Sequence, residues 1–195
     1  VSAESFRIPQ VLLINKKDLL TEDQQEKLLP MLKMYEAIGV TVHLISASFD
    51  ADLSPIQKIL EGKTTLVAGH SGVGKSTLLN RLAPEISQSV GAISDFSEKG
   101  THTTTFAEMF QLDENTFIID TPGIKEWGLV DMDPQEISDY FPEMRDLRLN
   151  CKFGSRCLHI NEPKCVIKEA VKNNQIALSR YESYLSMALG EDNRK

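Results

Sequence analysis

One short glycine-rich stretch constrains this chain most, because it separates a strand-like run from a helix-like run. Residues 64–68 are apolar and β-branched, and residues 78–82 have helical spacing. Gly69 and Gly74 permit backbone torsions that a Cβ disfavours, so successive N–H groups can converge on one anion at a helix N-terminus. The whole stretch is Gly69, His70, Ser71, Gly72, Val73, Gly74, Lys75, Ser76 and Thr77. It predicts a binding loop for the phosphates of a nucleoside triphosphate.

Two side chains of this loop and one later carboxylate are expected to serve the phosphates and their metal ion. Lys75 supplies a positive charge for the β- and γ-phosphates, which makes it a catalytic candidate, and Ser76 supplies a hydroxyl for Mg²⁺. An Asp-Thr-Pro-Gly sequence, from Asp120 to Gly123, follows an apolar run at 116–119. Asp120 can reach Mg²⁺ directly or through a water, and Gly123 leaves a backbone N–H free for the γ-phosphate.

A second pair of polar motifs indicates which base is bound. Asn15, Lys16 and Asp18 follow one apolar run, and Ser46 and Ala47 follow the next. The Asp18 carboxylate can accept from N1–H and the exocyclic amino group of guanine, which adenine does not offer. The Lys16 stem can cover the ring face, and the Ser46-Ala47 backbone can present an N–H to the guanine O6. The combination favours GTP over ATP.

The alternation of apolar runs with helical segments predicts an α/β fold with a mostly parallel sheet and helices on both faces. Strands are expected at 11–14, 40–45, 64–68, 106–112 (an edge strand) and 116–119. One helix is expected to begin at a Thr21 cap and to end at Gly39, with Pro30 kinking or dividing it. In such sheets ligands bind at the carboxyl ends of the strands, where the polar motifs lie.

Composition limits the partners and the setting. The chain has 195 residues and a net charge of −7, and no apolar stretch is long enough to span a membrane. Its N-terminus has neither a secretory signal nor an initiator Met, which suggests a fragment or a processed chain, and a cytoplasmic monomer is expected. Residues 145–195 hold ten Lys and Arg against six Asp and Glu, so any contact with a polyanion is expected there.

The three cysteines fall within fifteen residues, and one histidine lies among them. Cys151, Cys157, His159 and Cys165 can supply three thiolates and one imidazole, which suit tetrahedral Zn²⁺ in a closed, structural site. The loop-rich segment is too small to build its own core and would depend on the metal for its fold. A single helix from Cys165 to about residue 189 is expected to pack against it.

The motif set resembles that of translation-factor and Ras-type GTPases, but here the base motifs precede the phosphate motifs. This order, with His102-Thr103-Thr104-Thr105 and the downstream Cys/His cluster, is similar to the circularly permuted ribosome small-subunit-dependent GTPase A family (RsgA/YjeQ). The resemblance implies a permuted GTPase domain over 1–130 and a zinc-binding helical domain over 131–195. It also implies action on the small (30S) ribosomal subunit during late maturation, with 16S rRNA as the contact surface. Family members begin with an OB-fold barrel and a further strand, and this chain starts after both.

The catalytic group is the least defined part of the sequence. Thr103 or Thr104 is expected to complete the Mg²⁺ shell when GTP is bound, with the choice between them open. Ile124 occupies the position after Gly123, where a Ras-like enzyme places a water-orienting Gln, so slow intrinsic turnover is expected. His102 is the in-chain candidate for that role, which the resemblance supports; the alternative is a solvent-exposed loop histidine.

Two other classes of protein remain as alternatives. A P-loop ATPase or small-molecule kinase would need neither Asn15 and Asp18 nor Ser46, and competition between bases separates it from a GTPase. A non-catalytic RNA-binding zinc module with a vestigial nucleotide site is the other alternative. Against it, Lys75 and Asp120 are both retained.

Overall fold

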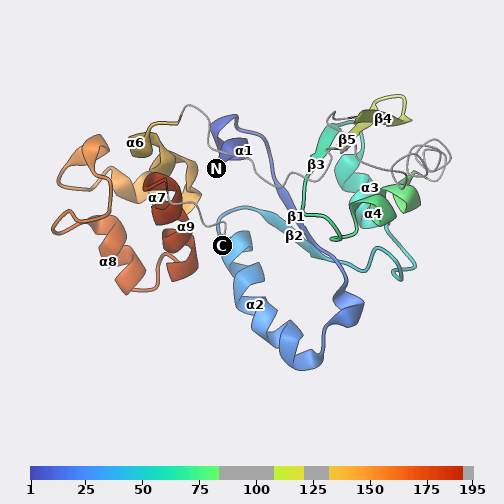
Figure 1. Ribbon diagram of the computed structural model, residues 1–195, viewed down its shortest axis with the longest axis horizontal. Helices are drawn as coiled ribbons and strands as arrows, with labels where there is room; N and C mark the ends of the chain where they lie inside the picture. The colour runs from blue at the N-terminus through green and yellow to red at the C-terminus, as the bar shows by residue number, and fades with distance from the viewer. Residues whose placement is uncertain (84–107, 121–131, 191–195) are drawn as a thin grey trace, which may run out of the picture. The chain divides into compact units, whose positions relative to one another are not determined.

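The structure is a computed structural model, and it describes residues 1–83, 108–120 and 132–190. The chain forms two compact units. The P-loop unit contains residues 13–26 and 43–127, and the cysteine unit contains residues 1–12, 27–42 and 128–195. Figure 1 shows the elements of both.

The strands lie where apolar runs were expected. They form a pair, β1-β2, and a three-stranded sheet in the order β3-β5-β4 (Figure 1). Within the sheet, β3 and β5 are parallel, with Val67 beside Asp120, and β4 is antiparallel to β5. The strand bounds are β1 Val11–Ile14, β2 Thr41–Leu44, β3 Thr64–Val67, β4 Glu108–Asp113 and β5 Thr116–Asp120. The predicted edge strand is confirmed, and the parallel pairing of β3 with β5 agrees with the predicted α/β fold.

The core of the P-loop unit holds the ends of these strands in place. Two helices contribute to it, α3 (Ser54–Leu60) and α4 (Lys75–Leu82). Its buried residues come from β5, from the segment between β2 and α3, and from the two helices: Ile45, Ala47, Leu53, Ile56, Leu60, Leu78 and Ile118. Because Leu78 is buried here, the first turn of α4 is fixed beside the end of β3.

The helix predicted from Thr21 is α2 (Glu22–Ala37), and its cap is reciprocal. The Gln24 backbone N–H donates to the Thr21 hydroxyl at 3.3 Å, and the Thr21 N–H donates to the Gln24 side-chain oxygen at 2.9 Å. This is a capping box, which satisfies two N–H groups that the helix leaves without partners. Pro30 lies inside the helix without dividing it, since one missing backbone bond is tolerated among 16 helical residues.

The cysteine unit is helical around its own core. Its elements are α1 Ser2–Ser5, α6 Pro134–Ile137, α7 Pro142–Arg148, α8 Val166–Lys172 and α9 Leu178–Ala188, with short 3-10 turns at Ser138–Tyr140 and Gly154–Arg156. The rings of Phe141 and Tyr184 are fully buried and meet edge to face, with their centroids 5.7 Å apart. The three cysteines belong to the same core. The cysteines are therefore part of the packing that holds this unit together.

The prediction of one helix from Cys165 to about residue 189 was wrong. The chain forms α8 and α9 with a turn between them, where Asn174 has a φ of 57°. The N–H groups of Gln175 and Ile176 both donate to the Ala170 carbonyl, which ends α8. Asparagine tolerates the left-handed region, and the turn it forms places Ile176 in the core.

None of the helices within residues 1–83, 108–120 and 132–190 combines the length and the apolar character needed to cross a membrane.

Candidate nucleotide site and metal cluster

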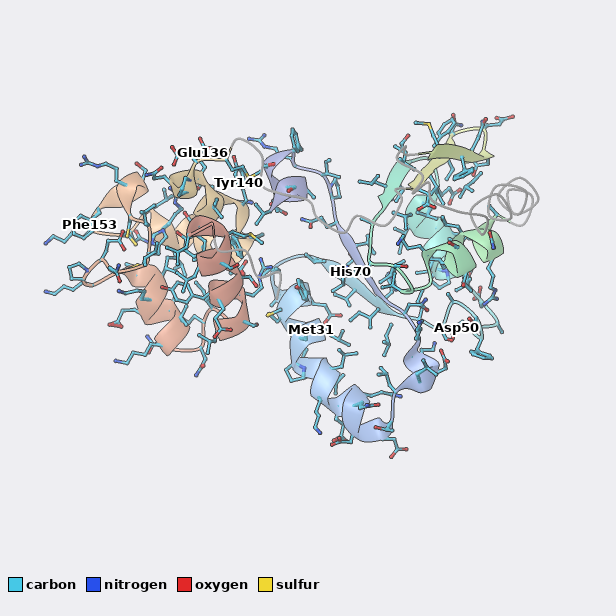
Figure 2. All side chains as sticks on the ribbon, viewed as in Figure 1. Met31, Asp50, His70, Glu136, Tyr140 and Phe153 are labelled. Carbon is cyan, nitrogen blue, oxygen red and sulfur yellow. The ribbon has the colours of Figure 1, made fainter. Side chains whose placement is uncertain are left out.

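The glycine-rich loop is a turn between β3 and α4, and two of its glycines have left-handed backbones. These are Gly72, with a φ of 78°, and Gly74, with a φ of 98°. Gly69 was expected to need such a torsion and does not adopt one. A Cβ on Gly69 would instead lie 3.2 Å from Cγ2 of Val73, so a close contact explains this glycine. His70, labelled in Figure 2, is exposed in the same turn.

The lysine of the loop points back across the turn. Its Nζ donates to the carbonyl of Gly69 at 2.6 Å and to the carbonyl of His70 at 3.0 Å. Lys75 is also the first residue of α4, so the same part of the loop carries a positive charge and a helix N-terminus. The remaining loop residues, Ser71, Val73, Ser76 and Thr77, are all exposed. The arrangement offers positive charge and several hydrogen-bond donors to an anion.

Asn15 joins the two halves of the predicted site. Its amide nitrogen donates to the Val73 carbonyl at 2.9 Å, inside the glycine-rich loop. Its amide oxygen accepts from the Ala47 N–H at 2.7 Å and from the Lys16 N–H at 2.8 Å. A Cβ on Gly74 would lie 2.3 Å from the Asn15 amide nitrogen and would displace it, and the φ of 98° also favours glycine at this position. The base motifs and the phosphate loop are therefore brought to one place.

The loop after β2 is held by carboxylates on two sides. The Ser46 hydroxyl donates to the Asp18 carboxylate, and the Ser46 N–H donates to the Asp50 carboxylate at 2.8 Å. Asp50 also pairs with Lys17, with an Nζ–Oδ1 distance of 2.6 Å. The Lys17 bond and the Ser46 N–H together hold the pKa of Asp50 below its ordinary value of 3.8.

Both N–H groups considered for the guanine O6 already donate within the protein, from Ser46 to Asp50 and from Ala47 to Asn15. Sequence reasoning missed Asp50, whose only signal is its place four residues after Ser46 in a polar loop. Figure 2 labels Asp50, which lies in the loop that follows β2. The Asp50 carboxylate therefore holds this loop through contacts that none of the sequence motifs predicts.

Ser76 and Asp120, two of the predicted magnesium ligands, line the same hollow in the P-loop unit. The parallel register of β3 and β5 places Asp120 beside Val67, next to the start of the glycine-rich loop. The remaining wall of the hollow is formed by Leu79, Asn80, Ala83, Phe110, Leu112 and Ile118. Four predicted site residues lie outside the described residues: His102, Thr103, Thr104 and Gly123.

All four residues of the predicted metal site are buried and converge. The ligand atoms of Cys151, Cys157, His159 and Cys165 lie within 4.8 Å of one another. His159 Nδ1 is 3.3 Å from the Cys165 sulfur and 3.6 Å from the Cys151 sulfur. Three sulfurs and one imidazole at this separation can surround one metal ion.

The backbone around the cluster is fixed by groups outside it. The hydroxyls of Tyr184 and Tyr181 donate to the carbonyls of Leu158 and His159, at 2.6 and 2.5 Å. The Glu162 carboxylate accepts from the N–H groups of Leu158 and Ile160, at 2.6 and 2.8 Å. These bonds hold His159 at a φ of 55°, a strained conformation for a non-glycine residue.

Burial shifts the pKa of three of the cluster's side chains. It lowers the pKa of His159, which favours the neutral imidazole, and it raises the pKa of the Cys157 and Cys165 thiols. A buried thiolate needs a compensating positive charge, and a divalent cation supplies one. The donor set, its burial and its spacing therefore fit a metal ion of the zinc type.

Together, the fold and the site define a circularly permuted P-loop GTPase fold, in which the base motifs precede the phosphate loop. Two solved structures share it. The crystal structure of YjeQ from Thermotoga maritima aligns with a TM-score of 0.78 and 34% identity, covering 100% of this chain and 64% of that one. YloQ, described as a circularly permuted GTPase, aligns with a TM-score of 0.77 and 30% identity, covering 100% of this chain and 61% of that one.

The chain belongs to the RsgA GTPase family, whose model matches residues 1–130. A Bacteroides thetaiotaomicron protein named small ribosomal subunit biogenesis GTPase RsgA 2 is 47% identical over 186 residues, covering 95% of this chain and 60% of that protein. A Christiangramia forsetii protein named small ribosomal subunit biogenesis GTPase RsgA is 44% identical over 192 residues, covering 98% of this chain and 61% of that protein. The chain therefore spans about 60% of the length of these relatives.

Proposed function

We propose that this chain binds GTP with Mg²⁺ and hydrolyses it to GDP and phosphate. The observation that carries the proposal is the set of bonds made by Asn15. They reach Val73 in the glycine-rich loop, here called the phosphate loop, and Ala47 in the loop after β2, here called the base loop (residues 46–50). A guanine-reading carboxylate, Asp18, lies three residues further along. A site built for guanine's donors discriminates against adenine, because adenine has neither the N1–H nor the exocyclic amino group that the remaining acceptor positions of the carboxylate are proposed to receive.

The phosphates and the magnesium ion are assigned to the other end of the site. The glycine-rich loop and Lys75 receive the phosphates, while Ser76 and Asp120 bind Mg²⁺. Their common hollow supports this assignment. Magnesium supplies charge neutralisation for the transferred phosphoryl group when it is bound. Gly123 is proposed to donate its N–H to the γ-phosphate.

The remaining catalytic roles are proposed from the sequence pattern. Thr103 or Thr104 closes the Mg²⁺ shell, and His102 orients the attacking water in place of the glutamine that Ile124 replaces. A GTPase whose water is poorly oriented turns over slowly until a loop or a partner completes the site. The names of the relatives support the small ribosomal subunit as that partner.

We propose that the chain acts in late maturation of the 30S subunit, as a cytoplasmic monomer that contacts 16S rRNA. The excess of positive charge in residues 145–195 supports such a contact, because phosphate backbones attract Lys and Arg. The Cys151-Cys157-His159-Cys165 cluster is proposed to hold one structural Zn²⁺. The GTPase domain is proposed to end near residue 130, where the helical zinc domain begins.

The testing experiment is GTP hydrolysis by this chain, with and without small ribosomal subunits and with ATP as the control. The proposal expects slow basal release of phosphate from GTP, strong stimulation by the subunits, and little hydrolysis of ATP. Equal use of ATP would overturn the assignment of the base. GTP binding without stimulation would overturn the assignment of the ribosomal partner to this part of the protein.

A further inference from the structure

Arg81, in the last turn of α4, makes a pair of contacts that no sequence motif marks. Its Nη1 donates to the carbonyl of Ala47 at 2.9 Å, and its Nη2 donates to the carbonyl of Asp50 at 2.6 Å. Both acceptors lie in the loop that follows β2, more than 30 residues earlier in the sequence. One guanidinium thus bridges both ends of the segment 47–50.

The segment held by Arg81 belongs to the proposed guanine site. Ala47 donates its N–H to Asn15, and its neighbour Ser46 donates its hydroxyl to Asp18. Ser46 and Ala47 are each only 1% exposed, so the loop is packed as well as hydrogen-bonded. A displacement of the carbonyls at 47 or 50 would therefore move the N–H and hydroxyl groups that orient Asn15 and Asp18.

The helix that carries Arg81 also carries the phosphate-binding residues. α4 begins at Lys75 and Ser76, and at about 1.5 Å per residue its eight residues span roughly 12 Å. Its first turn carries the residues proposed to bind the phosphates, and Arg81 in its last turn donates to the base loop. The helix is thus one short rigid connection between the two halves of the nucleotide site.

We propose that Arg81 is a positioning residue for guanine selection, which acts by fixing the Ser46–Asp50 loop to α4. The proposal rests on the proposed GTP-binding function and goes beyond it, because no nucleotide contact is assigned to Arg81. The guanidinium suits this task because its planar fork donates to two acceptors in fixed directions. Lysine, as a single point charge, cannot hold both carbonyls in the same geometry.

A merely structural role for Arg81 makes a different prediction. If the side chain only anchored α4, its loss would disturb Lys75 and Ser76 and would weaken the binding of every nucleoside diphosphate equally. If it positions the base loop, its loss weakens the binding of guanine nucleotides and leaves the contribution of the phosphate contacts to affinity unchanged. The ratio of GDP affinity to ADP affinity separates the two roles.

The test is equilibrium binding of GDP and of ADP, each with Mg²⁺, to the full 195-residue chain. The variants are Arg81→Ala and Arg81→Lys, and the latter keeps the charge and the aliphatic stem if the alanine variant does not fold. Lys63→Ala is the matched control, because Lys63 also donates to a backbone carbonyl, that of Ile59, but within the region of α3 and away from the base loop. Thermal unfolding of each variant is measured alongside binding.

We expect both Arg81 variants to bind GDP about tenfold more weakly, a loss of ~1.4 kcal/mol, while ADP binding changes by less than about twofold. Lys63→Ala should leave the GDP-to-ADP ratio unchanged. An unchanged ratio of GDP affinity to ADP affinity in both Arg81 variants, with or without equal losses of both affinities, would overturn the positioning role. The GTPase assignment would still stand. A wild-type chain that does not prefer GDP would instead overturn the proposed function itself.

Discussion

The side-chain amide of Asn15 donates to the backbone carbonyl of Val73 at 2.9 Å, across 58 positions of sequence. Val73 lies in the phosphate loop, and Asn15 follows the strand that delivers the base motif. The bond aligns two loops that follow different strands. It also explains Gly74, because a Cβ there would lie 2.3 Å from the same amide nitrogen. The predicted base motifs and the predicted phosphate loop are thus held together by one side chain.

Asn15→Ala should weaken GTP binding by tenfold or more, on the order of 1.4–3 kcal/mol. The substitution removes a donor to Val73 and an acceptor for the N–H groups of Ala47 and Lys16. Isothermal titration with a non-hydrolysable GTP analogue measures the loss. Asn115→Ala, in the exposed turn between β4 and β5, is the matched control and should bind as the wild type does. Equal affinities for wild type and Asn15→Ala would contradict the bridging role.

Two glycine-to-alanine substitutions separate the cost of a left-handed backbone from the cost of a steric clash with Asn15. Gly74 and Gly62 both have positive φ values, 98° and 67°, but nothing lies within 4 Å of a Cβ on Gly62. Gly62→Ala should therefore lower the free energy of unfolding by about 1 kcal/mol, because alanine is strained in a left-handed backbone. It should keep full GTP affinity. Gly74→Ala adds a collision with Asn15 and should lose GTP binding by at least about tenfold.

Urea unfolding and GTP titration on both variants measure these effects. If Gly74→Ala and Gly62→Ala lost stability and affinity in parallel, the collision with Asn15 would not be the cause.

The fold and most of the site could be predicted because their signals are local. A strand, a glycine-rich turn and a helix follow one another at 64–82, and each motif lies directly after its strand. The three cysteines and His159 fall within fifteen residues, so their convergence needed only a compact loop. In both cases neighbours in sequence are neighbours in space.

The features that sequence missed depend on contacts between a side chain and a distant backbone. Arg81 and Asp50 act on carbonyl or N–H groups, which every residue has and which leave no mark in the sequence. The break between α8 and α9 was missed because helical spacing continues through it. Asn174 adopts a left-handed backbone there, and Ile176 gains burial, two tertiary effects that outweigh periodicity.

Stability should depend on pH through Asp50. Its pKa is lowered in the folded chain, first by Lys17 and then by the Ser46 N–H. A carboxyl group of this kind adds stability above its unfolded pKa, and the contribution is lost as the pH falls through the folded pKa. The difference in unfolding free energy between wild type and Asp50→Asn should therefore be constant above about pH 5 and should shrink below about pH 4.

Urea unfolding from pH 3 to pH 7, followed by circular dichroism, measures this difference. Lys17→Met should flatten the profile, because it removes the largest cause of the lowered pKa. A difference that stayed constant down to pH 3 would show that the carboxylate is not stabilised by folding.

The cysteine unit should lose its fold when its metal site is broken. Cys151, Cys157 and Cys165 are core residues there, and without a metal ion their neighbourhood keeps three buried thiols beside a buried imidazole. Metal binding contributes on the order of 10 kcal/mol to small structural zinc sites, which is comparable to the whole net stability of a typical domain, about 5–15 kcal/mol. Cys165→Ser and His159→Gln should therefore abolish bound zinc and expose residues 132–190 to hydrogen exchange.

Metal content by elemental mass spectrometry and hydrogen exchange by peptide mapping give the two readouts. His43→Gln is the matched control, since His43 lies in β2 and outside the cluster, and it should keep one zinc per chain. GTP binding by the P-loop unit should survive in the cluster variants if that unit folds by its own core. Full exchange protection of residues 132–190 in a zinc-free variant would mean that apolar packing alone holds the unit, and the cluster would then need another role.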